Sequence, residues 1–407
     1  MTSRPLLLLP AALTIAALTA CSSAPSAAPS TAPTSGDGDG HGHGHGHGAI
    51  AGAEEVAEPP LGLLSIDAEG NTAVLDLLTD EAIDLGATAA PTALASDGRY
   101  GFATTDEGVE VIDSGRWSWD HGDHFHYYLA DPALLGTVPG DGPATVTSGA
   151  LSTAGTTGVF FAGSGEAVLL DNRSLSDGRI DELFRIDTGA DTGFLAPVGD
   201  GALVTDGDGL TYRDRDGEAV GAPVECVDPA GAITTRVGLV VGCADGAVLA
   251  TWHDDELATE RIPYPADASD RALTFDGRKG RPTVAAVAGT TGFWLLDTRE
   301  RTWTLVPTER PLTRVVAVDD AEGHVVAIDV DGRIVVHLAE GGAVVGATEP
   351  VLADGGSTAS LVVDEQRAYV SDPAGGVVHE IDYADGARIA RSLETPTAPA
   401  FVTEVGR

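Results

Sequence analysis

Tyr100-Gly-Phe-Ala-Thr-Thr105 followed by Gly108-Val-Glu-Val-Ile-Asp113 contains the pattern from which the fold is predicted. Both halves are short runs of apolar and β-branched residues, and the two positions between them form a turn, which predicts two paired strands. The same two-strand phrase begins again at residues 158, 202, 239, 284, 324 and 368, and its second strand often ends in Asp. Almost nothing in the chain has the period of a long amphipathic helix.

The phrase mostly recurs at intervals of about 37–45 residues, which is close to the blade length of a β-propeller. We therefore expect an all-β fold, a single β-propeller over residues 61–407. Seven copies predict seven blades. Two further strands, at residues 61–67 and 72–76, are expected to pair with the last blade and close the ring, which would remove free sheet edges.

One interval is longer than the others. The first and second copies start about 58 residues apart, roughly a dozen more than the usual blade period. The extra segment contains Asp120-His-Gly-Asp-His-Phe-His126, which packs three imidazoles and two carboxylates into seven residues. An insertion on a rigid β-scaffold is a typical place for a binding loop.

This insert is the strongest chemical signal in the sequence. In an extended chain His124 and His126 point to the same side, and Gly122 allows a bend that could bring His121 and Asp123 to the same point. Imidazole and carboxylate ligands without a thiolate suit Zn(II) and also Cu(II) or Ni(II). The metal-ligand candidates are Asp120, His121, Asp123, His124 and His126. The alternative is a polar turn whose histidines bind nothing.

The N-terminal residues 1–20 have the pattern of an export signal. Arg4 precedes an apolar run that is too short for a comfortable membrane span. The segment ends in Leu18-Thr-Ala-Cys21, which resembles a bacterial lipobox. That resemblance implies cleavage before Cys21, acylation of its thiol, and a lipoprotein on the outer face of the cytoplasmic membrane. The alternative is an ordinary secretory signal in which Cys21 is incidental.

Residues 21–60 are expected to be a disordered tether, because Ser, Ala, Pro and Gly dominate and no apolar periodicity is present. Four His-Gly repeats place imidazoles at His41, His43, His45 and His47. On a flexible backbone they should bind metal weakly, exchange it fast and discriminate poorly between metals. A low-complexity repeat without a role is the alternative.

The other two cysteines, Cys226 and Cys243, form an even pair in a protein expected to be exported. We predict a disulfide between neighbouring strands of one blade, worth about 3 kcal/mol on chain-entropy grounds. A metal-thiolate role is the weaker alternative.

Composition and motifs narrow the function classes. The net charge of -39, from 23 basic and 62 acidic residues, argues against nucleic acid or anionic lipid head groups as partners. No nucleophile elbow or phosphate-binding glycine loop is present, so nothing in the sequence specifies an enzyme. The isolated histidines, His253, His324, His337 and His379, are expected to have structural roles, with His253 and His379 the first to test as ligands.

The propeller phrase, the insert and the His-rich tether together resemble the exported zinc metallochaperones of the AztD type. The matching pieces are residues 112–128, the Gly242-Cys-Ala-Asp-Gly246 turn, and residues 368–373 through 379–383. The resemblance implies an ordered zinc-binding site at His121, Asp123, His124 and His126. It also implies a capture arm, a flexible segment at residues 41–47 that first binds the ion. This sequence differs from the family at residues 189–193 and 228–232, where the resemblance leads one to expect further His-rich turns but the sequence contains no histidine.

The leading hypothesis is an extracytoplasmic, monomeric zinc-binding protein that passes Zn(II) to the solute-binding protein of a zinc ABC importer. Neutral imidazoles are required, so binding should weaken as the pH falls through about 6.5. The rival hypotheses are a metal-dependent propeller hydrolase or lactonase, and a propeller that binds a partner and whose histidines are incidental. Histidines at the mouth of the central channel would favour an enzyme, and histidines on an outer loop would favour transfer.

Overall fold

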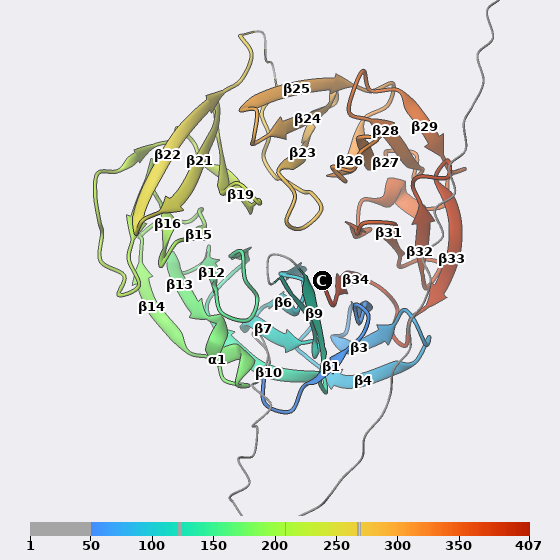
Figure 1. Cartoon of the computed structure of the whole chain (residues 1–407), viewed down its shortest axis with the longest axis horizontal. Helices are drawn as coiled ribbons and strands as arrows, with labels where there is room; N and C mark the ends of the chain where they lie inside the picture. The colour runs from blue at the N-terminus through green and yellow to red at the C-terminus, as the bar shows by residue number, and fades with distance from the viewer. Residues whose placement is uncertain (1–49, 121–123, 208, 267, 269) are drawn as a thin grey trace, which may run out of the picture. The chain divides into compact units, whose positions relative to one another are not determined.

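The computed structural model describes residues 50–407 except 121–123, 208, 267 and 269. Within these residues the chain forms nine antiparallel sheets, and eight of them stand in a ring as the blades of a β-propeller (Figure 1). The all-β prediction is therefore confirmed. The N-terminal residues 1–49, which include the predicted signal and most of the predicted tether, lie outside the described part of the chain.

In each blade the strands follow one another from the innermost strand outward. The first blade consists of β34 (Phe401–Val405), β2 (Gly62–Ile66), β3 (Asn71–Asp76) and β4 (Ala82–Ala87), and the second of β5 (Ala93–Ser96), β6 (Tyr100–Thr105), β7 (Gly108–Asp113) and β10 (Ala133–Pro139). The third blade consists of β11 (Ala144–Ser148), β12 (Thr156–Phe161), β13 (Glu166–Asp171) and β14 (Glu182–Asp187), and the fourth of β15 (Leu195–Val198), β16 (Gly201–Asp206), β17 (Gly209–Arg213) and β18 (Val224–Glu225).

The fifth blade consists of β19 (Ala230–Thr234), β20 (Leu239–Cys243), β21 (Gly246–His253) and β22 (Glu256–Pro263), and the sixth of β23 (Thr283–Ala288), β24 (Gly292–Asp297) and β25 (Thr302–Pro307). The seventh blade consists of β26 (Leu312–Ala317), β27 (His324–Asp329), β28 (Ile334–Leu338) and β29 (Val344–Ala347), and the eighth of β30 (Leu361–Val363), β31 (Ala368–Asp372), β32 (Val377–Asp382) and β33 (Arg388–Glu394). Two short helices, α1 (Asn172–Ser176) and the 3-10 turn η1 (Ala353–Gly356), lie between strands.

The predicted number of seven blades was one too low. Strands β2 and β3, which were expected to complete the last blade, instead belong to a separate blade with β34 and β4. The last strand of the chain pairs with the first blade strand, with Gly62 opposite Val405 and Ile66 opposite Phe401. This pairing closes the ring as expected, because it joins the two ends of the propeller by hydrogen bonds.

The core lies between neighbouring blades, and it explains the apolar runs in the sequence. Strand β27 is buried along its whole length, because its two faces contact the blades on either side. Ile328 and Val336 of one blade pack with Val370 and Ile381 of the next. A sheet covered on both faces needs apolar residues at successive positions, which is why these strands do not alternate cleanly with polar residues.

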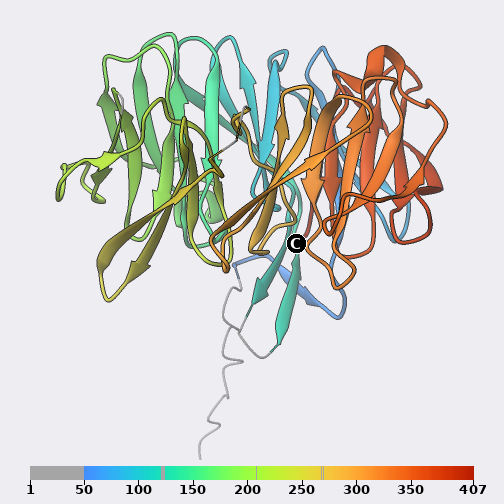
Figure 2. The ribbon, with the colours of Figure 1, turned by 90° about the horizontal axis from the view of Figure 1, so that it is seen from above.

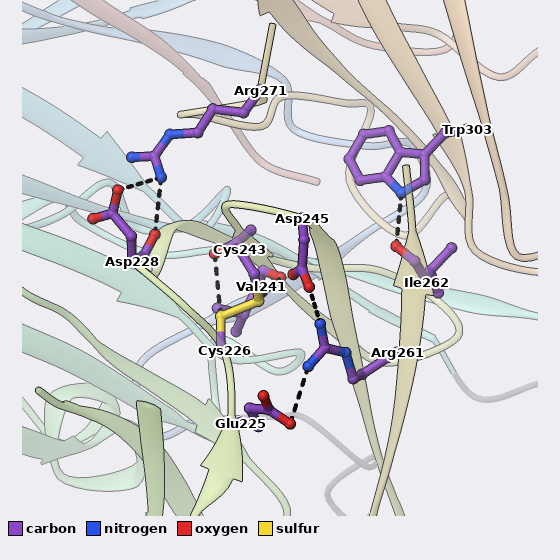
Figure 3. The surroundings of a disulfide bond; sticks show 11 residues. Glu225, Cys226, Asp228, Val241, Cys243, Asp245, Arg261, Ile262, Arg271 and Trp303 are labelled. Atoms are coloured by element: carbon purple, nitrogen blue, oxygen red, sulfur yellow. Dashed lines mark hydrogen bonds and ion pairs between the residues drawn. A yellow bond between two sulfur atoms is a disulfide. The ribbon is translucent and has the colours of Figure 1, made fainter. Parts of the chain in front are cut away.

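The disulfide between Cys226 and Cys243 is present, with the two Cα atoms 5.2 Å apart. Its expected place was wrong in one respect. Cys226 follows β18 at the outer edge of one blade, whereas Cys243 ends β20 of the next blade, so the bond fastens two blades together. Figure 3 shows Arg261 beside this bond, where its guanidinium lies between the carboxylates of Glu225 and Asp245.

The insert forms the ninth sheet. Strands β8 (Arg116–Asp120) and β9 (Phe125–Leu129) are a hairpin placed between the third and fourth strands of the second blade, and β1 (Glu54–Val56) pairs with β9. Figure 2 shows this hairpin projecting beyond one face of the ring. Strand β1 lies inside the range 21–60 that the sequence assigned to the tether. No helix among the described residues is long and apolar enough to cross a membrane.

Candidate metal centre on the projecting hairpin

The base of the hairpin is fixed by a turn that only glycine tolerates. Gly115 has a φ of +68°, and a Cβ there would lie 2.2 Å from the carbonyl oxygen of Ala130. The Ala130 amide donates to the Gly115 carbonyl at 2.7 Å, which closes the base of the hairpin. Asp113, the last residue of β7, accepts the Gly115 amide at 2.9 Å. These contacts therefore fix the direction in which the hairpin leaves the end of β7.

A column of stacked side chains ties the hairpin to the propeller. His126 stacks on Tyr128 with ring centroids 6.3 Å apart, and Tyr128 stacks on Trp117 at 5.3 Å. The guanidinium of Arg99 lies 4.0 Å from the centre of the Trp117 ring. Arg99 also forms a bidentate ion pair with Asp113, with nitrogen–oxygen distances of 3.0 and 2.6 Å. Because Trp117, Tyr128 and Arg99 are buried, the column holds the hairpin rigidly at its base.

Arg116 and Ser118 add two links to neighbouring parts of the ring. Arg116 donates to the carboxylate of Asp76 at 2.8 Å and to the carbonyl of Pro60 at 3.0 Å, both near the first blade. The Ser118 hydroxyl donates to the Gly406 carbonyl at 2.9 Å, directly after the ring-closing strand. The hairpin is thus attached both to its own blade and to the segments that close the ring.

Two imidazoles converge near the tip. The Nε2 atoms of His124 and His126 are 3.0 Å apart, and the two rings meet edge to face. His124 is exposed and His126 is half-buried. The alternation of side chains along an extended chain predicted that these two histidines share a side, and that prediction is confirmed.

The second nitrogen of His126 contacts a carboxylate from a distant part of the chain. Its Nδ1 lies 2.7 Å from Glu55 Oε1, although the two residues are 71 positions apart. An ionised carboxylate only accepts hydrogen bonds, so Nδ1 carries the proton and the Nε2 lone pair faces His124. A histidine that donates one ring nitrogen to a carboxylate while the other faces an ion is the usual arrangement at metal sites. The residues present therefore fit a divalent metal ion.

The sequence did not reveal Glu55. Its neighbours Glu54 and Glu58 are also acidic, and nothing in the local pattern distinguishes one of them. Only the antiparallel pairing of β1 with β9, which sets Glu55 opposite Tyr128, identifies it.

The other predicted ligands have different outcomes. Asp120 ends β8 on the exposed part of the hairpin, opposite Phe125. His121 and Asp123 lie outside the described residues, as do His41, His43, His45, His47 and the predicted lipidation site Cys21. Aromatic rings shield the histidine pair from solvent only in part. Tyr128 and Trp117 are buried, but Phe125 is 55 % exposed and stacks on Tyr127 on the opposite side of the hairpin.

The isolated histidines do not join this centre. His253 is exposed at the end of β21. His337 and His379 are buried within their blades, and burial lowers the pKa of each imidazole, because a charged ring is poorly solvated there. Their Nδ1 atoms contact the Gly342 carbonyl at 3.2 Å and the Ser392 hydroxyl at 3.1 Å, as expected of structural histidines.

His324 is different, because two carboxylates accompany it. Asp320, Glu322 and His324 offer ligand atoms within 4.8 Å of one another, and the His324 Nδ1 is 2.6 Å from Asp320. This contact holds the pKa of Asp320 below its usual value, although burial opposes the effect. The group is chemically compatible with a divalent ion. The adjacent cavity of about 420 Å³ has a lining of mixed charge, with Arg278, Arg281 and Arg367 beside the acidic residues Asp320, Glu322 and Glu365.

No family model matches the chain. Among solved structures, the crystal structure of AztD from Citrobacter koseri matches with a TM-score of 0.73 and 20% sequence identity, covering 85% of this chain and 97% of that chain. The structure of apo AztD from the same organism matches with a TM-score of 0.73 and 19% identity over the same shares. A putative 6-phosphogluconolactonase from Bacteroides uniformis has a TM-score of 0.52 and 13% identity, with coverages of 86% and 100%. The chain thus has the AztD-type propeller fold, and at these identities the likeness concerns the fold alone.

Proposed function

We propose that this protein binds Zn(II) at the hairpin and passes it to the solute-binding protein of a zinc ABC importer. The observation that carries the proposal is the pair of Nε2 atoms 3.0 Å apart, with Glu55 holding the other nitrogen of His126. The fold shared with AztD supports zinc as the cargo, and the nitrogen ligands suit it.

The separation of the two nitrogens is close to what zinc needs. With Zn–N bonds of about 2.0–2.1 Å and tetrahedral angles, two ligating nitrogens lie roughly 3.3 Å apart. The imidazoles therefore need to move by only a few tenths of an ångström. His121 and Asp123 are the predicted residues that would supply further ligands, whereas Asp120 is paired with Phe125 and points to the other side of the hairpin.

The position of the centre supports transfer more than catalysis. The hairpin projects from the face of the ring, and His124 at its tip is exposed (Figure 2). An ion held there can be approached by the ligands of another protein, so that bonds to the donor break as bonds to the acceptor form. We accordingly propose a binder and not an enzyme.

The His-Gly segment fits the same scheme as a capture arm. His47 precedes Glu54 by about seven residues, so an extended chain places it within about 24 Å of β1. Ions bound weakly at His41–His47 could then reach the hairpin without leaving the molecule, because the short connection keeps their effective concentration high. Acylation of Cys21 would tether the protein on the outer face of the cytoplasmic membrane, where we propose that it acts as a monomer, and the disulfide suits that compartment.

The experiment is zinc competition titration on a chain starting at residue 22 and on one starting at residue 50. The second start retains β1, because removing it would remove Glu55 with the tether. We expect the shorter chain to hold zinc tightly and the longer chain to add weak sites. Mixing the loaded shorter chain with a metal-free solute-binding protein should then transfer zinc faster than its spontaneous release. If the shorter chain binds no zinc, or if transfer is no faster than release, the proposal is wrong.

A further inference from the structure

Strand β1 is a separate element that completes the hairpin sheet. It has three residues, Glu54–Val56, and within the described part of the chain it pairs only with β9. Glu54 lies opposite Leu129, Glu55 opposite Tyr128 and Val56 opposite Tyr127. Both glutamates are exposed. In contrast to the blades, β1 buries no large apolar side chain. So short an edge strand contributes little to its own docking.

Only Glu55 of this strand reaches the imidazole pair. Side chains alternate along β1, so Glu54 and Glu55 point to opposite sides of the sheet. Glu55 accepts the Nδ1 proton of His126 and thereby leaves the Nε2 lone pair facing His124. In the metal-free state His124 must donate its Nε2 proton across the 3.0 Å contact. To bind an ion, His124 shifts its proton to its own Nδ1 by exchange with solvent and so frees its Nε2 lone pair, whereas His126 needs no change of tautomer.

We propose that Glu55 is a positioning residue for the metal centre, and that docking of β1 on β9 sets how tightly the hairpin holds its ion. This inference rests on the proposed function, because it concerns the same two histidines. When β1 is docked, the His126 ring is oriented and its tautomer is fixed. When β1 leaves, the ring rotates freely and prefers the other tautomer, so the ion is held less firmly. Release to an acceptor protein is then coupled to the segment that leads from the His-Gly repeats.

The first test compares Glu55→Ala with Glu54→Ala in the chain that starts at residue 50. Both changes remove one exposed carboxylate from the same strand, but only the first removes the contact with His126. We expect Glu55→Ala to weaken zinc binding by about 10–100-fold, the usual effect of losing a carboxylate behind a histidine ligand. Glu54→Ala should change the affinity less than threefold. Glu55→Gln, which keeps an acceptor oxygen, should recover most of the loss.

The second readout needs no metal. Nitrogen chemical shifts of the His126 side chain, measured on metal-free protein, report which ring nitrogen carries the proton. We expect the proton on Nδ1 in the unchanged chain and in Glu54→Ala, and mainly on Nε2 in Glu55→Ala. An unchanged tautomer in Glu55→Ala would overturn the positioning role.

The third test locks β1 in place. Glu54→Cys with Leu129→Cys joins two directly opposite residues, and neither residue is a metal-ligand candidate. The oxidised variant should bind zinc at least as tightly as the unchanged chain and release it several-fold more slowly to a chelator, and reduction should restore the faster rate. Equal release rates before and after reduction would show that docking does not control the ion. If the unchanged chain binds no zinc, the proposed function itself fails; if it binds zinc but the Glu55 and lock variants behave like it, only the present inference fails.

Discussion

The Nε2 atoms of His124 and His126 face each other across 3.0 Å at the end of a hairpin that stands outside the ring. The two residues are adjacent on one side of an extended chain, and the buried Trp117–Tyr128 stack below them fixes that side.

Removing one of these imidazoles should remove the tight site. We expect His126→Ala to weaken zinc binding by at least 100-fold in competition titration, because it takes away one ligand and the partner of Glu55. His253→Ala is the matched control, since His253 is exposed at the tip of another hairpin. If both variants lost zinc affinity equally, or if neither lost any, the assignment of the metal centre would be contradicted.

The ion pair between Asp113 and Arg99 beneath the hairpin should contribute to the stability of the folded protein. Asp113 binds Arg99 and the Gly115 amide while buried, so Asp113→Ala leaves a buried guanidinium without its carboxylate. We expect the free energy of unfolding in urea to fall by about 3–5 kcal/mol. The exposed carboxylate of Asp385, which pairs with Arg388, is the control, and Asp385→Ala should leave stability nearly unchanged. Similar stabilities of the two variants would refute the structural role of Asp113.

The bond between Cys226 and Cys243 should stabilise two blades at once. Replacing both cysteines with Ala should lower the free energy of unfolding by about 3 kcal/mol, because the unfolded chain regains the freedom of a 17-residue loop. Thermal unfolding with and without reductant checks this result. Reductant should lower the Tm of the unchanged chain to that of the variant and leave the variant unaffected; a variant as stable as the oxidised parent would disprove the prediction.

Stability should also depend on pH through Glu404. This residue on β34 is fully buried, and its carboxylate forms an ion pair with Arg407. Burial raises its pKa from 4.5 to about 8, although Arg407 at 3.1 Å opposes the shift. The folded state therefore binds the proton more tightly than the unfolded state. Its contribution to stability is complete below about pH 4.5 and is lost as the pH rises toward 8.

Glu404→Gln should remove this dependence, because the amide cannot ionise. Compared with the unchanged chain, the variant should gain stability between pH 5 and pH 8, by an amount on the order of a few kcal/mol. Glu394→Gln, an exposed change on β33, is the control and should leave the pH profile as it was. Denaturant unfolding at both pH values measures the difference, and parallel profiles for all three chains would show that Glu404 titrates normally.

The all-β propeller, the place of the insert and the pairing of the cysteines could all be predicted from the sequence. These features follow from local chemistry. Strand-forming runs at a regular period require repeated sheets, and a longer interval requires an insertion. The alternation of side chains also placed His124 and His126 on one side, which needs nothing beyond the extended backbone.

The way in which distant segments combine could not be predicted and is seen only in the folded protein. The blade count depended on β34 pairing with β2, and the disulfide joined two blades because Cys226 lies at the junction between them. Glu55 looked like any acidic residue of a tether until β1 paired with β9 and brought it to His126 across 71 positions. Register between strands that are far apart in sequence is set by the packing of the whole ring, and no local pattern encodes it.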